Sequence, residues 1–423
     1  MNLQQQNISD NNFESCIKCT ICTVYCPVTA VNPDYPGPKQ AGPDGERYRL
    51  KRPFFYDKAL KYCLNCKRCE VACPNEVRIG DIIQSAKLKY DDSRPSLRDT
   101  MLSSTDLMGT VATSMAPIVN YTLGLKPVKV LMDKILKIDD RRTFPHYASQ
   151  RFESWFHKKA ESTQDLYPRS FSYFHGCYVN YNYPQLGKDL LKVMNALGYG
   201  MHLLEGEKCC GVAKIVNRCI KEATRDAERN LVALRKAVAA GDEVLATSST
   251  CCFTLRDEYP DVLKLENTDI REAIMLAVRR IFILLDEGKA RIAFRKDYRK
   301  RIAYHVPCHM EKLGWSVFSS SLMRMIPGVD LIMLDSHCCG IAGTYGFKKE
   351  YYDYSQAIGA PVFRQIEECG CDIVASDCET CKWQIEMSTT KKVFNPISIL
   401  ADAIDEDETR RLNGVDSVPK VEF

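Results

Sequence analysis

The sequence predicts a chain of α plus α/β class, in which a helical N-terminal part precedes two repeated halves of strands and helices. Two cysteine motifs of identical spacing lie within the first 74 residues, and a second set of cysteine motifs occurs twice between residues 177 and 381. Strand-like and helix-like segments alternate between the members of that second set. Such alternation is typical of βαβ units with parallel sheets.

Composition limits the possible functions. A chain of 423 residues that is 45% apolar can form two or three domains, and a formal charge of +4 is too small to indicate a nucleic-acid partner. The N-terminus, MNLQQQNISDNNFE, does not have the pattern of a signal peptide, and no apolar run is long enough to cross a bilayer. We therefore expect the 21 cysteines to lie in a reducing cytoplasm, where clustered thiols indicate metal or redox chemistry.

Both N-terminal motifs, CIKCTICTVYCP and CLNCKRCEVACP, have the form C-x2-C-x2-C-x3-C-P. In bacterial ferredoxins of this spacing, three close cysteines hold one [4Fe–4S] cluster and the fourth reaches the other cluster. Zinc is the alternative, although zinc sites usually pair C-x2-C units. The expected ligands are Cys16, Cys19, Cys22 and Cys73 for the first cluster, and Cys63, Cys66, Cys69 and Cys26 for the second.

The segments that flank the second motif are expected to be helical. PFFYDKALKYC, residues 53–63, follows a loop rich in proline and glycine, and VRIGDIIQSAKLKY covers residues 77–90.

The second set of motifs reads HGC, CCG and STCCFT in one half, and HVPC, CCG and SDCETC in the other. Cys177 corresponds to Cys308 at an offset of 131 residues, the CCG pairs lie 129 residues apart, and Cys251 corresponds to Cys378 at an offset of 127. Each motif ends a strand-like run, and helices are expected at 184–198 and 223–240. Because ligands collect beyond the carboxyl ends of parallel strands, thiols should gather at one edge of each half.

We expect two local features at this edge. Gly211 and Gly340 would permit close approach of the backbone to a cluster. The N-terminus of the helix that follows each glycine would favour an anionic cluster.

The C…CCG…CxxC arrangement resembles the cysteine-rich domain of heterodisulfide reductase and of iron–sulfur subunits of membrane-linked dehydrogenases. Up to about residue 404, the chain resembles the family of C subunits of anaerobic glycerol-3-phosphate dehydrogenases. The resemblance rests on CIKCTICTVYCPVTAVNPDYPGPKQAGPDGER, YCLNCKRCEVACP, HCCGIAGTYGFKKE and DCETCKWQIEMS. We therefore divide the chain into a helical dicluster ferredoxin domain (1–100), an amphipathic linker (101–167), a first CCG half (168–290), a second CCG half (291–404) and a polar tail (405–423).

The resemblance implies a non-cubane [4Fe–4S] cluster held by five cysteines in each half. The second half supplies all five: Cys308, Cys338, Cys339, Cys378 and Cys381. The first half is degenerate, because it matches at Cys177, Cys209, Cys210 and Cys251 but has Thr254 in the last position and Cys252 out of register. Structural thiols or a disulfide are the alternatives. Three cysteines outside the pattern are expected to be ordinary buried residues, namely Cys219, Cys369 and Cys371.

Four histidines lie within three residues of a cysteine motif: His175, His305, His309 and His337. They are candidates for hydrogen bonds to cluster sulfur, for ligation or for proton transfer to a quinone, and the alternative is a hydrogen-bonded histidine at a sheet edge. Glu311 and Lys312 are expected to lie on a solvated helix face.

The chain has no GxGxxG motif after a strand and no P-loop, and GIAGTYG (340–346) belongs to the CCG turn, so no flavin site is visible. We therefore expect a non-catalytic electron carrier. The resemblance implies its partners, which are a flavin-containing catalytic subunit and a second flavin-linked subunit that oxidise sn-glycerol 3-phosphate, and menaquinone as the acceptor. It also implies peripheral attachment to the cytoplasmic side of the inner membrane.

From Pro127 the pattern is that of a basic amphipathic helix, with Val128, Leu131, Met132, Ile135 and Leu136 on one face. This helix can lie in a membrane interface, but a docking helix or an inter-domain helix is the alternative. Three other functions also stay open. They are an electron-transfer subunit of a glycolate or lactate oxidase complex, a disulfide reductase that acts at the second CCG half, and a scaffold with purely structural clusters.

Overall fold

The structure is a computed structural model that describes residues 12–51, 57–91 and 93–422. The expectation about a signal peptide concerns residues 1–14, of which residues 1–11 lie outside the described residues. The helix predicted for residues 53–63 also lies partly outside, and its described part forms the short 3-10 helix η5 (Lys58–Tyr62).

The N-terminal part is helical, as predicted. It contains α1 (Ile21–Val24), α2 (Gly45–Lys51), α3 (Arg68–Val71) and α4 (Ile79–Tyr90), and its described residues form no strand. The core is formed by apolar side chains such as Leu60, Val77 and Ile83. Cys338 and Tyr345 from the far end of the chain belong to the same core, so the N-terminal part packs directly on the second half.

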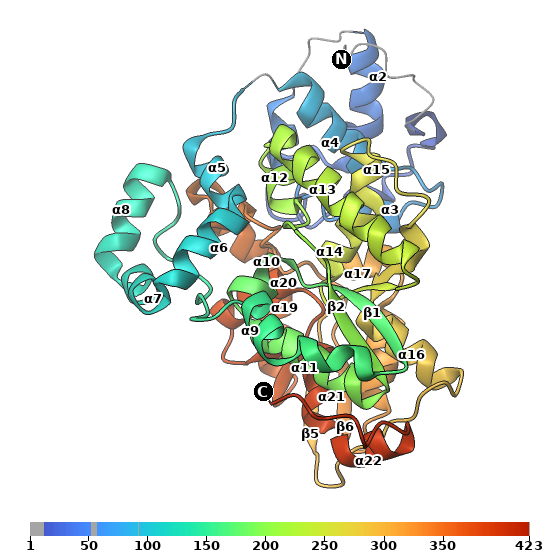
Figure 1. Cartoon of the computed structure of the whole chain (residues 1–423). Coiled ribbons are helices and arrows are strands. Elements are labelled where there is room, and N and C mark those ends of the chain that lie inside the picture. Colours follow the sequence, from blue (N-terminus) through green and yellow to red (C-terminus); the bar gives the residue numbers. More distant parts are fainter. Residues whose placement is uncertain (1–11, 52–56, 92, 423) are drawn as a thin grey trace.

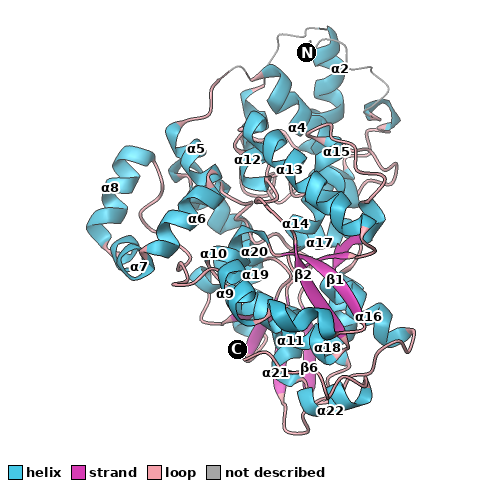
Figure 2. Ribbon diagram, viewed as in Figure 1, coloured by secondary structure: helices cyan, strands magenta, loops and turns pink. Residues whose placement is uncertain are grey.

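The rest of the chain contains two four-stranded parallel sheets, which confirms the predicted fold class. The first has the order β2-β1-β3-β4 and the second the order β6-β5-β7-β8. Their strands are β1 (Arg169–Phe174), β2 (Tyr199–Leu203), β3 (Val244–Ala246), β4 (Ile274–Leu276), β5 (Lys300–Tyr304), β6 (Val329–Met333), β7 (Ile373–Ala375) and β8 (Val393–Phe394). Six of them were predicted, whereas the short edge strands β4 and β8 were not. Figure 2 shows the strands in the lower part of the view, away from the N-terminal helices.

The two halves share one apolar core. The predicted helices 184–198 and 223–240 are confirmed as α11 (Pro184–Ala196) and α13 (Ile220–Ala239). In the first half α16 (Ala277–Asp286) also covers the sheet, and it packs on α18 (Ser316–Arg324) of the second half. Likewise α11 packs on α21 (Pro396–Ala403). The sheets are therefore held at a fixed distance from each other.

The linker forms an arm and then returns to the first sheet. The arm consists of α5 (Leu97–Ser103), α6 (Thr105–Ser114), α7 (Ala116–Gly124) and α8 (Lys126–Leu136), and Figure 1 shows α7 and α8 projecting sideways from the body. The predicted amphipathic helix is α8, which has a proline in its first turn and no buried residue. Among the described residues, no helix combines the length and apolar character needed to cross a membrane.

The polar segment after Ile404 is packed on the body of the protein. It contains α22 (Glu406–Leu412), in which Arg410 is buried and donates hydrogen bonds to Tyr167 Oη (3.1 Å) and to the carbonyl of Val415 (2.8 Å).

Candidate metal centres

The first predicted set of thiols gathers at one site. Cys16, Cys19, Cys22 and Cys73 line one small cavity together with Lys39. Burial, and after it the charges of the other three thiolates, raises the pKa of Cys22. No carboxylate lines this cavity. Four thiols beside one cation suit an anionic cluster that is bound by thiolates.

The second set lines a cavity of the same kind. Cys26, Cys63, Cys66 and Cys69 surround it, again with a lysine, Lys67, and without a carboxylate. Burial raises the pKa of Cys26 to about 12, and the nearby Cys66 contributes. The structure therefore groups the eight cysteines into the two sets expected from their spacing.

The two motifs also share one backbone conformation. Lys18 and Thr20 have φ of 62° and 66°, and the matching residues Asn65 and Lys67 have φ of 54° and 62°. This left-handed region is costly for residues other than glycine, so each loop is held by its surroundings. In the second loop, Lys67 is 1% exposed and forms ion pairs with Asp81 and Glu70.

The second CCG half brings its five cysteines to the carboxyl ends of β5, β6 and β7. They line a cavity of about 80 Å³, which we call the five-cysteine cavity: Cys308, Cys338, Cys339, Cys378 and Cys381. The Sγ atoms of Cys339 and Cys381 are 3.2 Å apart. Gly340 has φ of 87°, and a Cβ at this position would lie 2.0 Å from the carbonyl of Ser355. Only glycine fits there, as expected from the sequence.

One expectation about these turns is wrong for the second half. Gly211 is the N-cap of the short helix α12 (Val212–Val216). After Gly340, by contrast, two 3-10 turns, η9 (Tyr345–Phe347) and η10 (Lys349–Tyr351), precede α19 (Tyr352–Glu368). No helix N-terminus directly follows the second CCG motif, because the chain instead turns through Ala342 and Gly343, both with positive φ.

Of the four candidate histidines, His305 is placed best to meet a cluster. One ring nitrogen of His305 and the sulfur atoms of Cys339 and Cys381 lie within 4.8 Å of one another, and Nε2 of His305 has no hydrogen-bond partner among the described residues. Burial lowers the pKa of His305 to about 4, so the ring is neutral. A neutral imidazole can donate a hydrogen bond to sulfur or ligate iron.

The other three histidines have different surroundings. His175 lies beside the carboxylate of Glu207, at 3.1 Å. His309 lines the five-cysteine cavity, with Nδ1 3.3 Å from Thr250 Oγ1 and its ring stacked on Phe253. His337 is exposed.

The first CCG half brings together four thiols but not the fifth position. Contacts join Cys209 to both Cys177 and Cys210. The contact with Cys209 is the first cause of the raised pKa of Cys177, and for Cys210 it is followed by the contact with Cys251. Thr254 instead donates a hydrogen bond to Glu258 Oε2, at 2.9 Å. Cys252, which follows Cys251, is fully buried in the apolar core.

A carboxylate that the sequence did not suggest also reaches this half. Asp106 of α6 accepts a hydrogen bond from the backbone N–H of Cys209 at 3.0 Å. Burial, and then the charge of Cys209, raises the pKa of Asp106 to about 6. Asp106 and Cys209 lie 103 positions apart, and no local pattern marks such a pair.

The N-terminal part docks on the second half through its cysteine loop. Cys66 lines both its own cavity and the five-cysteine cavity, and its thiol is in hydrogen-bonding reach of Cys308. Arg68 donates hydrogen bonds to Glu311 Oε2 (3.0 Å) and to the Ser336 side chain (2.6 Å) and carbonyl (2.8 Å). Lys312 pairs with Glu70 at 2.8 Å.

The prediction of a solvated face for Glu311 and Lys312 is therefore wrong. Both residues are on α17 (Cys308–Leu313), which packs against α3 of the N-terminal part. Their charged groups pair with residues of the second ferredoxin motif and join the two domains.

Two protein families match parts of this chain. A family described as cysteine-rich domain, CCG, matches residues 171–256 and 302–386, and a 4Fe–4S dicluster domain family matches residues 12–77. The C subunit of the anaerobic glycerol-3-phosphate dehydrogenase of Escherichia coli K12 is 58% identical over 94% of this chain and 100% of its own length.

Two more distant relatives share parts of the same architecture. The glycolate oxidase iron–sulfur subunit of E. coli K12 is 24% identical over 94% of this chain and 96% of its own. The D subunit of the dihydromethanophenazine:CoB–CoM heterodisulfide reductase of Methanosarcina barkeri is 30% identical over 50% of this chain and 52% of its own.

Proposed function

Because this chain belongs to the family of C subunits of anaerobic glycerol-3-phosphate dehydrogenase, we propose that it carries electrons from a flavin-containing catalytic subunit to the quinone pool. The observation that carries this proposal is the series of three thiol sites. It runs from the Cys16 set through the Cys63 set to the five-cysteine cavity, and Cys66 borders the last two. Iron–sulfur clusters, when bound at such sites, accept and release single electrons.

The outer end of the series suits a docking surface for the flavin-containing subunit. Cys19 is exposed, and apolar side chains surround the first motif, with Ile17 63%, Val24 81% and Tyr25 54% exposed. An exposed apolar patch of this kind is typical of a protein–protein contact. The second flavin-linked subunit would complete the same assembly.

We propose three clusters on this chain. Each ferredoxin set would hold one [4Fe–4S] cubane through its four cysteines, and the five cysteines of the second CCG half would hold a non-cubane cluster. In the first half the Thr254 side chain is engaged by Glu258, so the remaining four thiols form an incomplete site.

The arm is proposed to lie on the cytoplasmic side of the inner membrane as a peripheral anchor. Its apolar side chains are exposed along three successive helices, at Leu107, Val111, Ile118, Tyr121, Leu131 and Ile135. On α8 they stand beside Lys126, Lys129 and Lys134. Apolar side chains next to lysines bind an interface that contains anionic lipid.

The test is an iron count on protein that is purified without oxygen, with electron paramagnetic resonance during a redox titration. Two cubanes would give about 8 irons per chain, and one additional four-iron cluster about 12. We expect about 12, together with quinone reduction when the flavin subunits, glycerol 3-phosphate and vesicles are supplied. Eight irons without an additional signal would remove the third cluster, and filled clusters without quinone reduction would refute the carrier function.

One alternative function has an observation in its favour. The CCG halves also occur in a heterodisulfide reductase subunit, and the five-cysteine cavity is the corresponding place in this chain. A disulfide reductase would consume a small disulfide when it is given reduced clusters alone. A carrier would need the quinone.

A further inference from the structure

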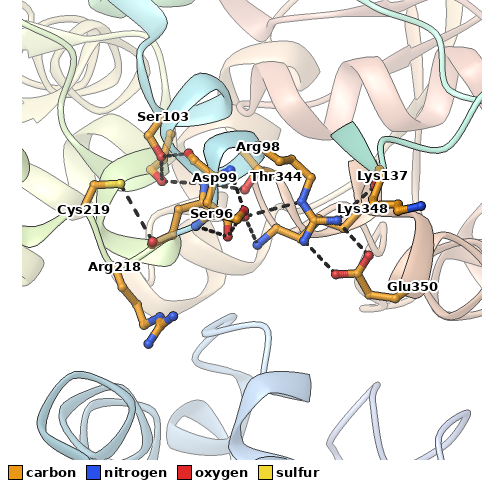
Figure 3. A network of polar contacts seen from close by, with 12 residues as sticks. Ser96, Arg98, Asp99, Ser103, Lys137, Arg218, Cys219, Thr344, Lys348 and Glu350 are labelled. Atoms are coloured by element: carbon orange, nitrogen blue, oxygen red, sulfur yellow. Dashed lines mark hydrogen bonds and ion pairs between the residues drawn. The ribbon is translucent and has the colours of Figure 1, made fainter. Parts of the chain in front are cut away.

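A larger cavity lies beside the thiol sites. It has a volume of about 480 Å³ and is lined by the N-terminal part, by the start of the arm and by the second half, with an additional edge from the first half. We call it the basic cavity. Figure 3 shows part of its wall, where Arg98 and Asp99 of α5 meet Lys348 and Glu350 of the second half.

The basic cavity shares walls with two thiol sites. Cys63 lines both the basic cavity and the cavity of the second cubane. Leu64, Val216 and Ala342 line both the basic cavity and the five-cysteine cavity. A molecule bound in the basic cavity would therefore contact residues that border both proposed electron carriers.

Positive charge exceeds negative charge around the basic cavity. Its three carboxylates are paired with cations, in Asp91–Arg218 (2.6 Å), Glu350–Arg98 (2.7 Å) and Asp99–Lys348 (2.7 Å). Three additional lysines line it, and among the described residues none of them forms an ion pair with a carboxylate: Lys58, Lys61 and Lys87. Such a surface favours an occupant that gains negative charge.

The lining also contains unused hydrogen-bonding groups. Tyr345 Oη and Asn217 Oδ1 are buried and have no hydrogen-bond partner among the described residues. Lys87 Nζ donates to the carbonyl of Cys63 at 2.7 Å, which leaves two of its three protons for other acceptors. A buried polar group without a partner is costly, and a ligand can remove that cost.

We propose that the basic cavity binds the carbonyl head group of the quinone, which is reduced there and not within the five-cysteine cavity. This inference rests on the function proposed above. The hydroxyl of Tyr345 and the ammonium group of Lys87 would donate to the two quinone oxygens, and the excess lysines would stabilise the negative charge that the electrons bring. The balance is quinone plus two electrons plus two protons giving quinol, with electrons from the reduced clusters and protons from water.

The arm gives the quinone a route from the lipid. Arg98 lines the cavity from α5, the first helix of the arm, and its neighbour Leu97 is 69% exposed. Exposed apolar side chains follow along the chain on α6 to α8, among them Leu107, Ile118 and Leu131. The apolar tail of a bound quinone could therefore extend along the arm while its head group occupies the basic cavity.

The experiment measures binding of the quinone analogue 2-heptyl-4-hydroxyquinoline N-oxide to the complete cluster-loaded complex, by quenching of its fluorescence. Tyr345→Phe removes one oxygen and Lys61→Gln one charge, and each should weaken binding about fivefold or more. Each should also lower the rate of menadione reduction relative to the rate of reduction of a dye acceptor by the same preparation. The control is Lys89→Gln, an exposed lysine on α4 outside the cavity, which should change neither quantity.

The outcomes separate the two proposals. Wild-type complex that reduces the dye but no quinone would refute the carrier function. Wild-type complex that reduces quinone, with unchanged analogue binding in both variants, would refute the location in the basic cavity. Displacement of the analogue by inorganic phosphate but not by menadione would also overturn it, because the cavity would then be a site for small anions. If Tyr345→Phe loses iron, analogue binding by Lys61→Gln still tests the location in the basic cavity, because Lys61 is exposed at the rim.

Discussion

The two CCG halves have the same sheet order but different partners at the carboxyl ends of their strands. In the first half, α6 of the arm covers the thiols and Asp106 accepts a hydrogen bond from Cys209. In the second half, the ferredoxin domain covers the thiols, and its Cys66 borders the same cavity as Cys308. The repeat therefore preserves the scaffold, while the neighbouring segment differs: the ferredoxin domain borders only the second half's thiols through Cys66, so under the proposed function that half would exchange electrons with the ferredoxin clusters.

A single position shows how the two halves differ. Cys381 lines the five-cysteine cavity, whereas the equivalent Thr254 is bonded to Glu258, which accepts a hydrogen bond from Asn65 of the ferredoxin domain at 2.8 Å. The position that lacks a thiol in the first half thus takes part in a contact that reaches the ferredoxin domain. The incomplete half supports the geometry that the complete half needs.

The largest expected effect separates the two CCG pairs. Cys338→Ser should remove about four irons and the additional paramagnetic signal, and lower the quinone-linked rate by about 100-fold or more, because it removes a proposed ligand of the third cluster. The matched change Cys209→Ser should leave the iron count near 12. Iron analysis and spectroscopy of both variants check this. Equal iron losses would show that both halves hold clusters.

The next effect tests the docking of the ferredoxin domain. Arg68→Met breaks a nearly buried ion pair and two hydrogen bonds to Ser336, and should cost about 3–5 kcal/mol of unfolding free energy. The control is Arg78→Met, which removes the half-exposed guanidinium and its pairs with Asp261 and Asp81, and should cost about 1 kcal/mol or less. Anaerobic denaturant unfolding measures both values. Equal losses of unfolding free energy would contradict the view that the ferredoxin domain is held mainly by its contact with the second half.

The contacts of the ferredoxin domain also show which features of the structure can be predicted from the sequence. Periodicity and spacing are properties of neighbouring residues. They predicted six strands, two long helices of the halves and the grouping of the ferredoxin cysteines. Strands β4 and β8 are short and do not lead into a cysteine motif, whereas β3 and β7, which have three residues each, do. The contacts of Glu311 with Arg68 and of Asp106 with Cys209 join residues 243 and 103 positions apart. Such pairs depend on how domains dock, and no local pattern encodes them.

A smaller effect tests whether the degenerate position can be restored. Thr254→Cys replaces a buried hydroxyl that bonds Glu258, and should cost about 1–2 kcal/mol of unfolding free energy without any gain of iron. Thr254→Ser keeps the hydroxyl and serves as the control, with a smaller cost. Thermal unfolding and iron analysis of both variants give the answer. A gain of about four irons in Thr254→Cys would show that the side chain can turn toward the thiols.

The smallest effect concerns Glu258, whose carboxyl group accepts the hydrogen bond of Thr254. Burial raises the pKa of Glu258 above its ordinary value, although the charge of Lys67 opposes the shift. The folded protein therefore keeps a proton on Glu258 over a pH interval in which the unfolded chain has released it. The stability due to that proton is complete below the ordinary pKa and is lost progressively as the pH rises to the raised value.

Glu258→Gln should remove this dependence, because an amide does not titrate and can still bond Thr254. The midpoint of thermal unfolding, measured from about pH 5 to about pH 8, should then vary less with pH in Glu258→Gln than in the wild type. The exposed Glu228 gives the control, and Glu228→Gln should retain the wild-type profile. An unchanged profile in Glu258→Gln would mean that Lys67 outweighs burial and keeps the carboxylate charged. Glu258 would then form a charged link between the incomplete half and the ferredoxin domain.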